Sequence, residues 1–174
     1  MASRRDFFRS ILKPTETVAQ KAAAPIHIRP PYAVSESLFQ SLCIECESKA
    51  CASSCEEGII VISADGIPIL NLQKSGCTFC QECANVCESD VLSLELGKEI
   101  INAKFIIDPN SCMAHHNSIC FSCKEPCIDD AILFNGMFNP VIDDSKCTAC
   151  GFCMSRCPTN AITFKPTPIA DSEV

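Results

Sequence analysis

Short apolar runs separated by tight turns dominate the hydrophobic pattern of this chain. Three pairs of β-rich runs each flank a turn that contains glycine, and each pair predicts a β-hairpin. The pairs are IIVIS and IPILNL around Asp65-Gly66, VLSLEL and IINAKFIID around Gly97-Lys98-Glu99, and AILF and PVID around Asn135-Gly136. A last strand is predicted at Ala161–Phe164.

One helix and two irregular segments precede these runs. Residues 35–42 predict a short helix, with Ser35 as its N-cap and with Leu38 and Leu42 on the face that packs onto the first cysteine loop. Residues 14–31 are rich in Ala, Thr and Pro and predict a flexible connector. The stretch IRPPY at 28–32 is expected to be extended, because proline disfavours helix in the residue before it.

The 16 cysteines change this picture, because all of them fall in four groups that alternate with the apolar runs. The groups are Cys43, Cys46, Cys51 and Cys55; Cys77, Cys80, Cys83 and Cys87; Cys112, Cys120, Cys123 and Cys127; and Cys147, Cys150, Cys153 and Cys157. The fourth group, CTACGFCMSRCP, has the spacing C-x2-C-x2-C-x3-C-P, which is typical of bacterial ferredoxins that bind [4Fe–4S] clusters. The second group keeps this spacing, with Glu88 in place of proline. Recurrence at a similar interval indicates an array of one supersecondary unit.

Groups one and three depart from the standard spacing. Four residues separate Cys46 from Cys51, and seven separate Cys112 from Cys120. We expect all sixteen cysteines to bind iron, in four [4Fe–4S] clusters; the alternative is that group three is degenerate and the chain holds three.

In two-cluster ferredoxins the fourth cysteine of one run binds the other cluster. Applied to the pairs of groups, this rule predicts four ligand sets. The sets are Cys43, Cys46, Cys51 and Cys87; Cys77, Cys80, Cys83 and Cys55; Cys112, Cys120, Cys123 and Cys157; and Cys147, Cys150, Cys153 and Cys127. Metal ligation should then supply much of the folding free energy, and the apo-protein should be poorly folded.

These elements predict an α+β fold of repeated ferredoxin-like modules, with small hairpins and short helices around the clusters. We expect an N-terminal segment at 1–33, four cluster units, and a tail at 168–174. The units are 34–66, 67–97, the irregular 101–136, and 138–167.

Two kinds of residue near the cysteines are secondary candidates. His115 and His116 lie in the insertion of group three, and we expect them to be solvent-exposed loop residues rather than metal ligands. Phe79, Phe121 and Phe152 each lie inside a C-x2-C and would keep water from the sulfurs, or would simply be core residues.

Composition and charge exclude several classes of protein. A disulfide framework does not call for repeated C-x2-C-x2-C-x3-C runs, and zinc sites usually pair two C-x2-C knuckles across a longer gap. The net charge of −7 argues against nucleic acid as a partner and suits docking to a protein surface. No stretch is long and apolar enough to span a bilayer. We expect no enzyme, because the sequence has no Gly-rich phosphate loop and every cysteine is better used as a ligand than as a nucleophile.

The N-terminus carries a possible export signal. The run Ser3-Arg4-Arg5-Asp6-Phe7-Phe8-Arg9 resembles the twin-arginine motif. No apolar segment of about 7–15 residues follows, and such a signal needs one. We therefore expect a cytoplasmic protein; Arg4 and Arg5 would form a solvated basic tail or a short docking segment.

Nearly the whole chain resembles the NapF family, ferredoxin-type proteins encoded with periplasmic nitrate reductases. The resemblance covers the Ser3-Arg4-Arg5 start, IRPPY, FQSLCIEC, CTFCQECANVC, CMAHHNSICFSCKEPC and CTACGFCMSRCPTNAIT. It implies a cytoplasmic iron–sulfur protein that contacts the catalytic molybdenum subunit of the reductase before that subunit is exported. The implied role is maturation, through electron delivery or cluster assembly. The two extra residues between Cys46 and Cys51 depart from the family pattern.

A second function class fits the same residues. Closely spaced clusters in a small acidic protein would also suit a general polyferredoxin electron carrier, or an electron-transfer subunit of a redox complex that docks redox partner proteins.

Overall fold

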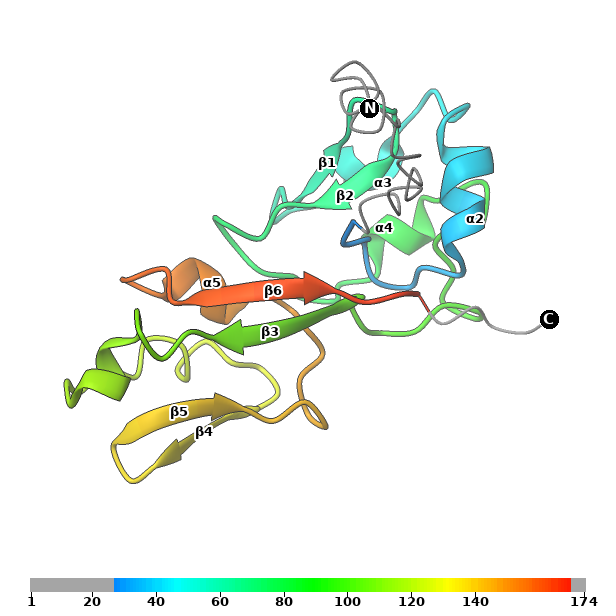
Figure 1. Cartoon of the computed structure of the whole chain (residues 1–174). Helices are drawn as coiled ribbons and strands as arrows, with labels where there is room; N and C mark the ends of the chain where they lie inside the picture. The colour runs from blue at the N-terminus through cyan, green and yellow to red at the C-terminus, as the bar shows by residue number, and fades with distance from the viewer. Residues whose placement is uncertain (1–26, 170–174) are drawn as a thin grey trace, which may run out of the picture.

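The computed structural model describes residues 27–169. The twin-arginine-like run and most of the predicted connector lie outside this range. Figure 1 shows two halves side by side. The first contains α2 (Glu36–Leu38), the π-helix η1 (Phe39–Cys43), α3 (Ala50–Ser53), β1 (Ile60–Ile62), β2 (Pro68–Leu70) and α4 (Glu82–Asn85). The second contains β3 (Ala103–Ile107), the 3-10 helix η2 (Met113–His116), β4 (Ile132–Asn135), β5 (Phe138–Ile142), α5 (Phe152–Arg156) and β6 (Ile162–Pro166).

A common turn follows the last cysteine of every group. In each repeat, the residue three positions after that cysteine has a φ of 47° to 60° and donates its backbone N–H to the cysteine carbonyl, at 3.0 to 3.3 Å. These residues are Gly58, Asp90, Asp130 and Asn160, and Gly, Asp and Asn tolerate this conformation best. Two buried apolar residues come next in all four repeats, from Ile59-Ile60 to Ala161-Ile162. The irregular third group therefore ends in the same turn and buried pair as the others.

Two of the three predicted hairpins are confirmed. Strand β1 pairs antiparallel with β2, and β4 pairs antiparallel with β5 across the Asn135-Gly136 turn. The predicted hairpin between VLSLEL and IINAKFIID is wrong. Strand β3, from the second of these runs, pairs with β6, where Phe105 lies opposite Phe164 with ring centroids 5.9 Å apart. The VLSLEL run makes only an isolated bridge, between Leu92 and Ala33.

The two runs do not pair with each other because each one holds a different half of the molecule together. Strand β3 opens the second half and β6 ends it, so their pairing ties that half together (Figure 1). In the first half the corresponding contact is the Ala33–Leu92 bridge, supported by the Val34 N–H, which donates to the carbonyl of Val91 at 3.1 Å. A longer ladder is limited there, because Pro30 and Pro31 have no N–H to donate.

The predicted helix near residue 35 is confirmed. The Ser35 hydroxyl accepts from the N–H of Leu38 at 3.4 Å and caps α2, which continues through η1 to Cys43. Leu38 packs partly buried against the core, whereas Leu42 remains 38% exposed at the edge of the cysteine loop.

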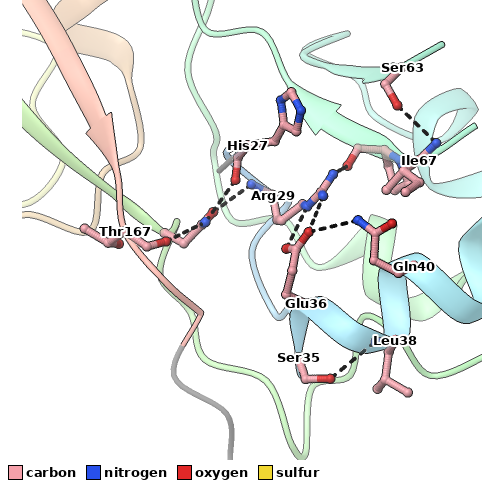
Figure 2. A network of polar contacts seen from close by, with 11 residues as sticks. His27, Arg29, Ser35, Glu36, Leu38, Gln40, Ser63, Ile67 and Thr167 are labelled. Carbon is pink, nitrogen blue, oxygen red and sulfur yellow. Dashed lines mark hydrogen bonds and ion pairs between the residues drawn. The ribbon is translucent and has the colours of Figure 1, made fainter. Parts of the chain in front are cut away.

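The segment 27–34, here called the strap, is anchored by a buried arginine. The side chain of Arg29 is 2% exposed and forms an ion pair with the carboxylate of Glu36, which is 45% exposed (Figure 2). Arg29 Nη1 also donates to the carbonyl of Pro68 at 3.1 Å, and its guanidinium lies 5.0 Å from the ring centroid of Phe39. These contacts hold the strap against both α2 and β2.

Asn102 joins the strap to the second half. Its amide Nδ2 donates to the carbonyl of His27 at 3.1 Å and to that of Thr167 at 2.9 Å, while its Oδ1 accepts from the N–H of Arg29 at 2.7 Å. Three distant parts of the chain therefore meet at one side chain.

The predicted α+β fold of repeated ferredoxin-like modules is confirmed. Small two-stranded sheets and helices of three to five residues surround the cysteine loops. Among residues 27–169, no helix has the length and apolarity needed to cross a membrane.

Candidate metal centres

Each of four cavities is lined by four cysteines. Cavity A is lined by Cys43, Cys46, Cys51 and Cys87; cavity B by Cys55, Cys77, Cys80 and Cys83; cavity C by Cys112, Cys120, Cys123 and Cys157; and cavity D by Cys127, Cys147, Cys150 and Cys153. Cavity A, at about 530 Å³, is wider than the other three. These are the sets expected if the fourth cysteine of each group serves the neighbouring group.

The loops of groups two and four have the same backbone geometry. Phe79 and Ala149 precede the second cysteine of their groups with φ of 55° and 63°, and Gln81 and Gly151 follow it with φ of 70° and 89°. Gln81 and Gly151 then start helices α4 and α5, which carry the third cysteine of each group. Left-handed residues on both sides of a cysteine let the short loop curl around a cavity.

In group one, Lys49 explains the wider spacing. It has a φ of 44° and lies at the start of α3, which carries Cys51. Its Nζ donates to the carbonyl of Cys43 and, at 2.7 Å, to the carbonyl of Gly66 in the β1–β2 turn. The wider spacing thus accommodates a lysine that ties the cysteine loop to the hairpin.

Backbone amides donate to several cysteine sulfurs. The N–H of Ala131 lies 3.3 Å from Cys127 Sγ, and the N–H of Ala161 lies 3.2 Å from Cys157 Sγ. The N–H of Leu92 donates to the corresponding sulfur of group two at 3.5 Å. Hydrogen bonds of this kind stabilise thiolate charge and tune the potential of an iron–sulfur cluster.

The electrostatics of the cavities favour a cationic occupant. Burial raises the pKa of eight thiols, among them Cys83, to about 12, and Cys43, Cys77, Cys123 and Cys150, to about 11. The charges of neighbouring cysteines add to the rise in each of them. Iron supplies the positive charge that would keep such thiols deprotonated near neutral pH.

The arrangement of the thiols suits a cluster better than a single ion. Every cysteine is a free thiol. Within residues 27–169, no group of three or more His, Cys, Asp or Glu side chains is placed to hold one metal ion. A [4Fe–4S] cluster needs four cysteines spread around a volume, because each thiolate binds a different iron, and the four cavities provide this arrangement.

The phenylalanines and histidines near the cysteines lie in different environments. Phe79 is buried and lines cavity B, where its carbonyl accepts from the Tyr32 hydroxyl at 3.1 Å, whereas Phe121 packs on Phe134 with ring centroids 4.8 Å apart. His116 is exposed, as predicted, with Nε2 3.0 Å from the carbonyl of Asn110. The expectation for His115 is wrong, because it is half-buried in η2. Its Nδ1 is buried without a hydrogen-bond partner among the described residues.

Three functional features escaped prediction from the sequence. These are the Lys49 anchor, the amide donors to sulfur, and the turn three residues after each last cysteine. A signal for the turn was present, since Gly, Asp, Asp and Asn occupy that position in the four repeats.

Comparison with known protein families supports iron–sulfur binding. The 4Fe-4S dicluster domain matches residues 42–91, and the 4Fe-4S binding domain matches residues 140–163. These ranges include groups one, two and four, and group three falls between them. The chain therefore binds 4Fe-4S clusters, at least two in number.

Similar curated proteins cover most of the chain. The ferredoxin-type protein NapG of Escherichia coli (strain K12) is 26% identical, over 85% of this chain and 73% of its own length. The methylamine utilization ferredoxin-type protein MauM of Methylobacillus flagellatus is also 26% identical, over 86% of this chain and 72% of its own. The ferredoxin-type protein NapF of Escherichia coli (strain K12) is 33% identical, over 78% of this chain and 83% of its own. The chain belongs to the NapF family of ferredoxin-type proteins.

Proposed function

We propose that this chain binds four [4Fe–4S] clusters, one in each of cavities A to D, through its sixteen cysteines. The observation that carries this proposal is that each cavity is lined by four cysteines, three from one group and one from its neighbour. The turn and buried pair shared by all four repeats favour four clusters over three, since group three ends in the same way as the groups with standard spacing. The predicted units at 34–66, 67–97, 101–136 and 138–167 would each contribute one group.

We further propose that the protein assists maturation of the catalytic molybdenum subunit of periplasmic nitrate reductase before export. Membership of the NapF family supports this role. The protein would act in the cytoplasm, where the catalytic subunit is found before its export. It would deliver electrons or help to assemble the partner's cluster, with its cysteines serving as ligands and without catalysing a reaction of its own.

Binding and deletion test this role together. Anaerobically purified protein should bind the catalytic subunit that retains its export signal, and deletion of the gene should lower the activity of the exported reductase. A variant that loses the cluster of cavity B, such as Cys83→Ala, should fail to restore that activity, whereas the surface variant Asp144→Asn should restore it fully. Absence of binding together with full reductase activity after deletion would exclude the maturation role.

A general electron carrier is the second candidate. The similarity to MauM, whose name refers to methylamine utilization, favours a role that is not restricted to one reductase. Rapid and reversible electron exchange with several unrelated proteins, with no maturation defect on deletion, would favour this alternative.

A further inference from the structure

The two halves of the molecule touch through the cysteine loops themselves. The backbone N–H of Cys77 donates to the carbonyl of Cys150 at 2.7 Å. A Cβ atom added to Gly76 would lie 2.5 Å from the amide nitrogen of Phe152 and 2.8 Å from the carbonyl oxygen of Cys150. One added to Gly151 would lie 2.8 Å from Leu72 Cδ1. We call residues 76–77 and 150–152 the loop contact. Glycine is needed at position 76 because the two backbones approach closely there, and at position 151 because its φ is 89° and the Leu72 side chain packs against it.

The loop contact joins a cysteine of cavity B to a cysteine of cavity D. From Cys77 Sγ the path runs along covalent bonds to the backbone nitrogen, crosses one hydrogen bond, and follows covalent bonds to Cys150 Sγ. No through-space jump is needed. Cys150 is also among the charges that raise the pKa of Cys77, as expected for two neighbouring sulfurs.

Cavities A and C lie on the outer sides of the pair formed by cavities B and D. Cavities A and B are both lined by cysteines of groups one and two, and cavities C and D are both lined by cysteines of groups three and four. Among the described residues, the hydrogen bond from Cys77 to Cys150 links cavity B to cavity D, and no hydrogen bond links a cysteine of cavity A to one of cavity C. The order along the molecule is therefore A, B, D, C.

We propose that the loop contact is the electron path between the two halves, so that the four cavities form one conduit with A and C at its ends. In each transfer, the cluster on one side loses one electron and the cluster on the other side gains it, and no bond or proton changes place. This inference rests on the proposed occupation of the cavities by [4Fe–4S] clusters. It assigns Gly76 and Gly151 a positioning role.

Among residues 27–169, the other hydrogen bonds that join the halves involve no cysteine. Asn102 binds backbone groups of His27, Arg29 and Thr167, and the N–H of Ile101 donates to the carbonyl of Thr148 at 3.1 Å. These contacts hold the halves together, whereas the loop contact links the metal ligands directly.

Selective removal of clusters tests the order. The double variant Cys46→Ala/Cys112→Ala should lose the clusters of cavities A and C and keep those of B and D, which lie in different halves. After full reduction, electron paramagnetic resonance should show strong spin coupling between the two remaining clusters. The reciprocal variant Cys80→Ala/Cys147→Ala keeps only A and C and should show no such coupling. Coupling between A and C, or its absence between B and D, would overturn the proposed order.

A glycine substitution tests the contact itself. In the first double variant, Gly76→Ala should cause loss of the spin coupling between B and D at unchanged iron and sulfide content. Gly136→Ala is the control, since a Cβ there meets nothing within 4 Å. Unchanged coupling in Gly76→Ala would refute the path.

If the double variants do not fold, the glycine variants can be compared in protein that keeps all four clusters. The quantity measured is then the rate at which electrons equilibrate between the halves after rapid partial reduction. It should be slower in Gly76→Ala than in Gly136→Ala, and equal rates would refute the path. A protein without iron would instead overturn the proposed cluster binding. Normal reductase maturation after deletion of the gene, in a protein whose clusters B and D are coupled, would overturn the maturation role and leave the electron path standing. The two failures are therefore distinguishable.

Discussion

The ion pair between Arg29 and Glu36 holds the strap against the first half, and its removal should make the clusters of that half easier to lose in denaturant. In the variant Glu36→Gln the side chain keeps its shape but loses its charge. The Arg29 guanidinium then remains 2% exposed without a counter-charge. Its hydrogen bond to the carbonyl of Pro68 is retained, so the variant isolates the electrostatic contribution.

The exposure of the two partners sets the size of the effect. Loss of one partner from a fully buried pair costs about 3–5 kcal/mol, and loss from a surface pair about 0–1 kcal/mol. Glu36 is 45% exposed, so water replaces part of its interaction. We expect a loss of about 1–2 kcal/mol, which corresponds to a factor of about 5–30 in the ratio of folded to unfolded protein.

The assay is the rate at which the visible cluster absorbance bleaches in guanidinium chloride under anaerobic conditions. A rate is appropriate, because protein that loses its clusters does not return to the native state on the same time scale. The matched control is Asp144→Asn, whose partner is Lys104 and whose pair is 55% exposed on both sides. That variant should bleach almost as slowly as the unmodified protein.

The bleaching rates of the two variants test whether the ion pair holds the strap in place. If Glu36→Gln bleaches no faster than Asp144→Asn, the buried arginine does not hold the strap in place. The closure of the first half would then depend on the other contacts of the strap, such as those of Asn102 and the Ala33–Leu92 bridge.

Three further predictions concern single residues near the cavities. Tyr32→Phe should destabilise the protein by about 1 kcal/mol, because the carbonyl of Phe79 loses its donor. Burial raises the pKa of Tyr32 to about 12. The stability contributed by its hydroxyl is therefore complete below pH 10 and is lost as the pH rises from 10 to about 12. Denaturation at several pH values should show this loss in the unmodified protein and not in Tyr32→Phe. Lys49→Gln should lower the reduction potential of the cluster in cavity A, because a positive charge that favours the reduced state is removed; potentiometric titration that shows no shift would contradict this. Asp130→Ala should cost about 1–2 kcal/mol through its φ of 47°, whereas Asp130→Gly should be nearly neutral, and equal denaturation midpoints for both would contradict the strain argument.

Local patterns predicted the parts of the fold that depend on neighbouring residues. The helix capped by Ser35 and the two hairpins around glycine turns are of this kind. The pairing of β3 with β6 could not be predicted in this way, because an apolar alternating run has the same appearance whichever strand it joins. The choice depends on which half the run closes, which is a property of the whole chain.

The residues of the candidate site were likewise predicted only in part from the sequence. The cysteine spacing indicated the ligand residues, but the Lys49 anchor and the buried Arg29 were not predicted. Lysine and arginine are usually exposed, and their burial depends on carbonyl and carboxylate partners that lie far along the chain. The turn after each last cysteine could have been found from the recurring Gly, Asp or Asn, and it would have placed group three with the other groups.

The most direct test of the four-cluster account is the iron and acid-labile sulfide content of anaerobically purified protein, together with electron paramagnetic resonance of the reduced form. Four cavities with four cysteines each predict about sixteen irons and sixteen sulfides per chain, with the signals of interacting [4Fe–4S] clusters. About twelve of each would contradict the account, because group three would then hold no cluster despite its shared fold. Bound zinc with little iron would contradict iron–sulfur binding altogether.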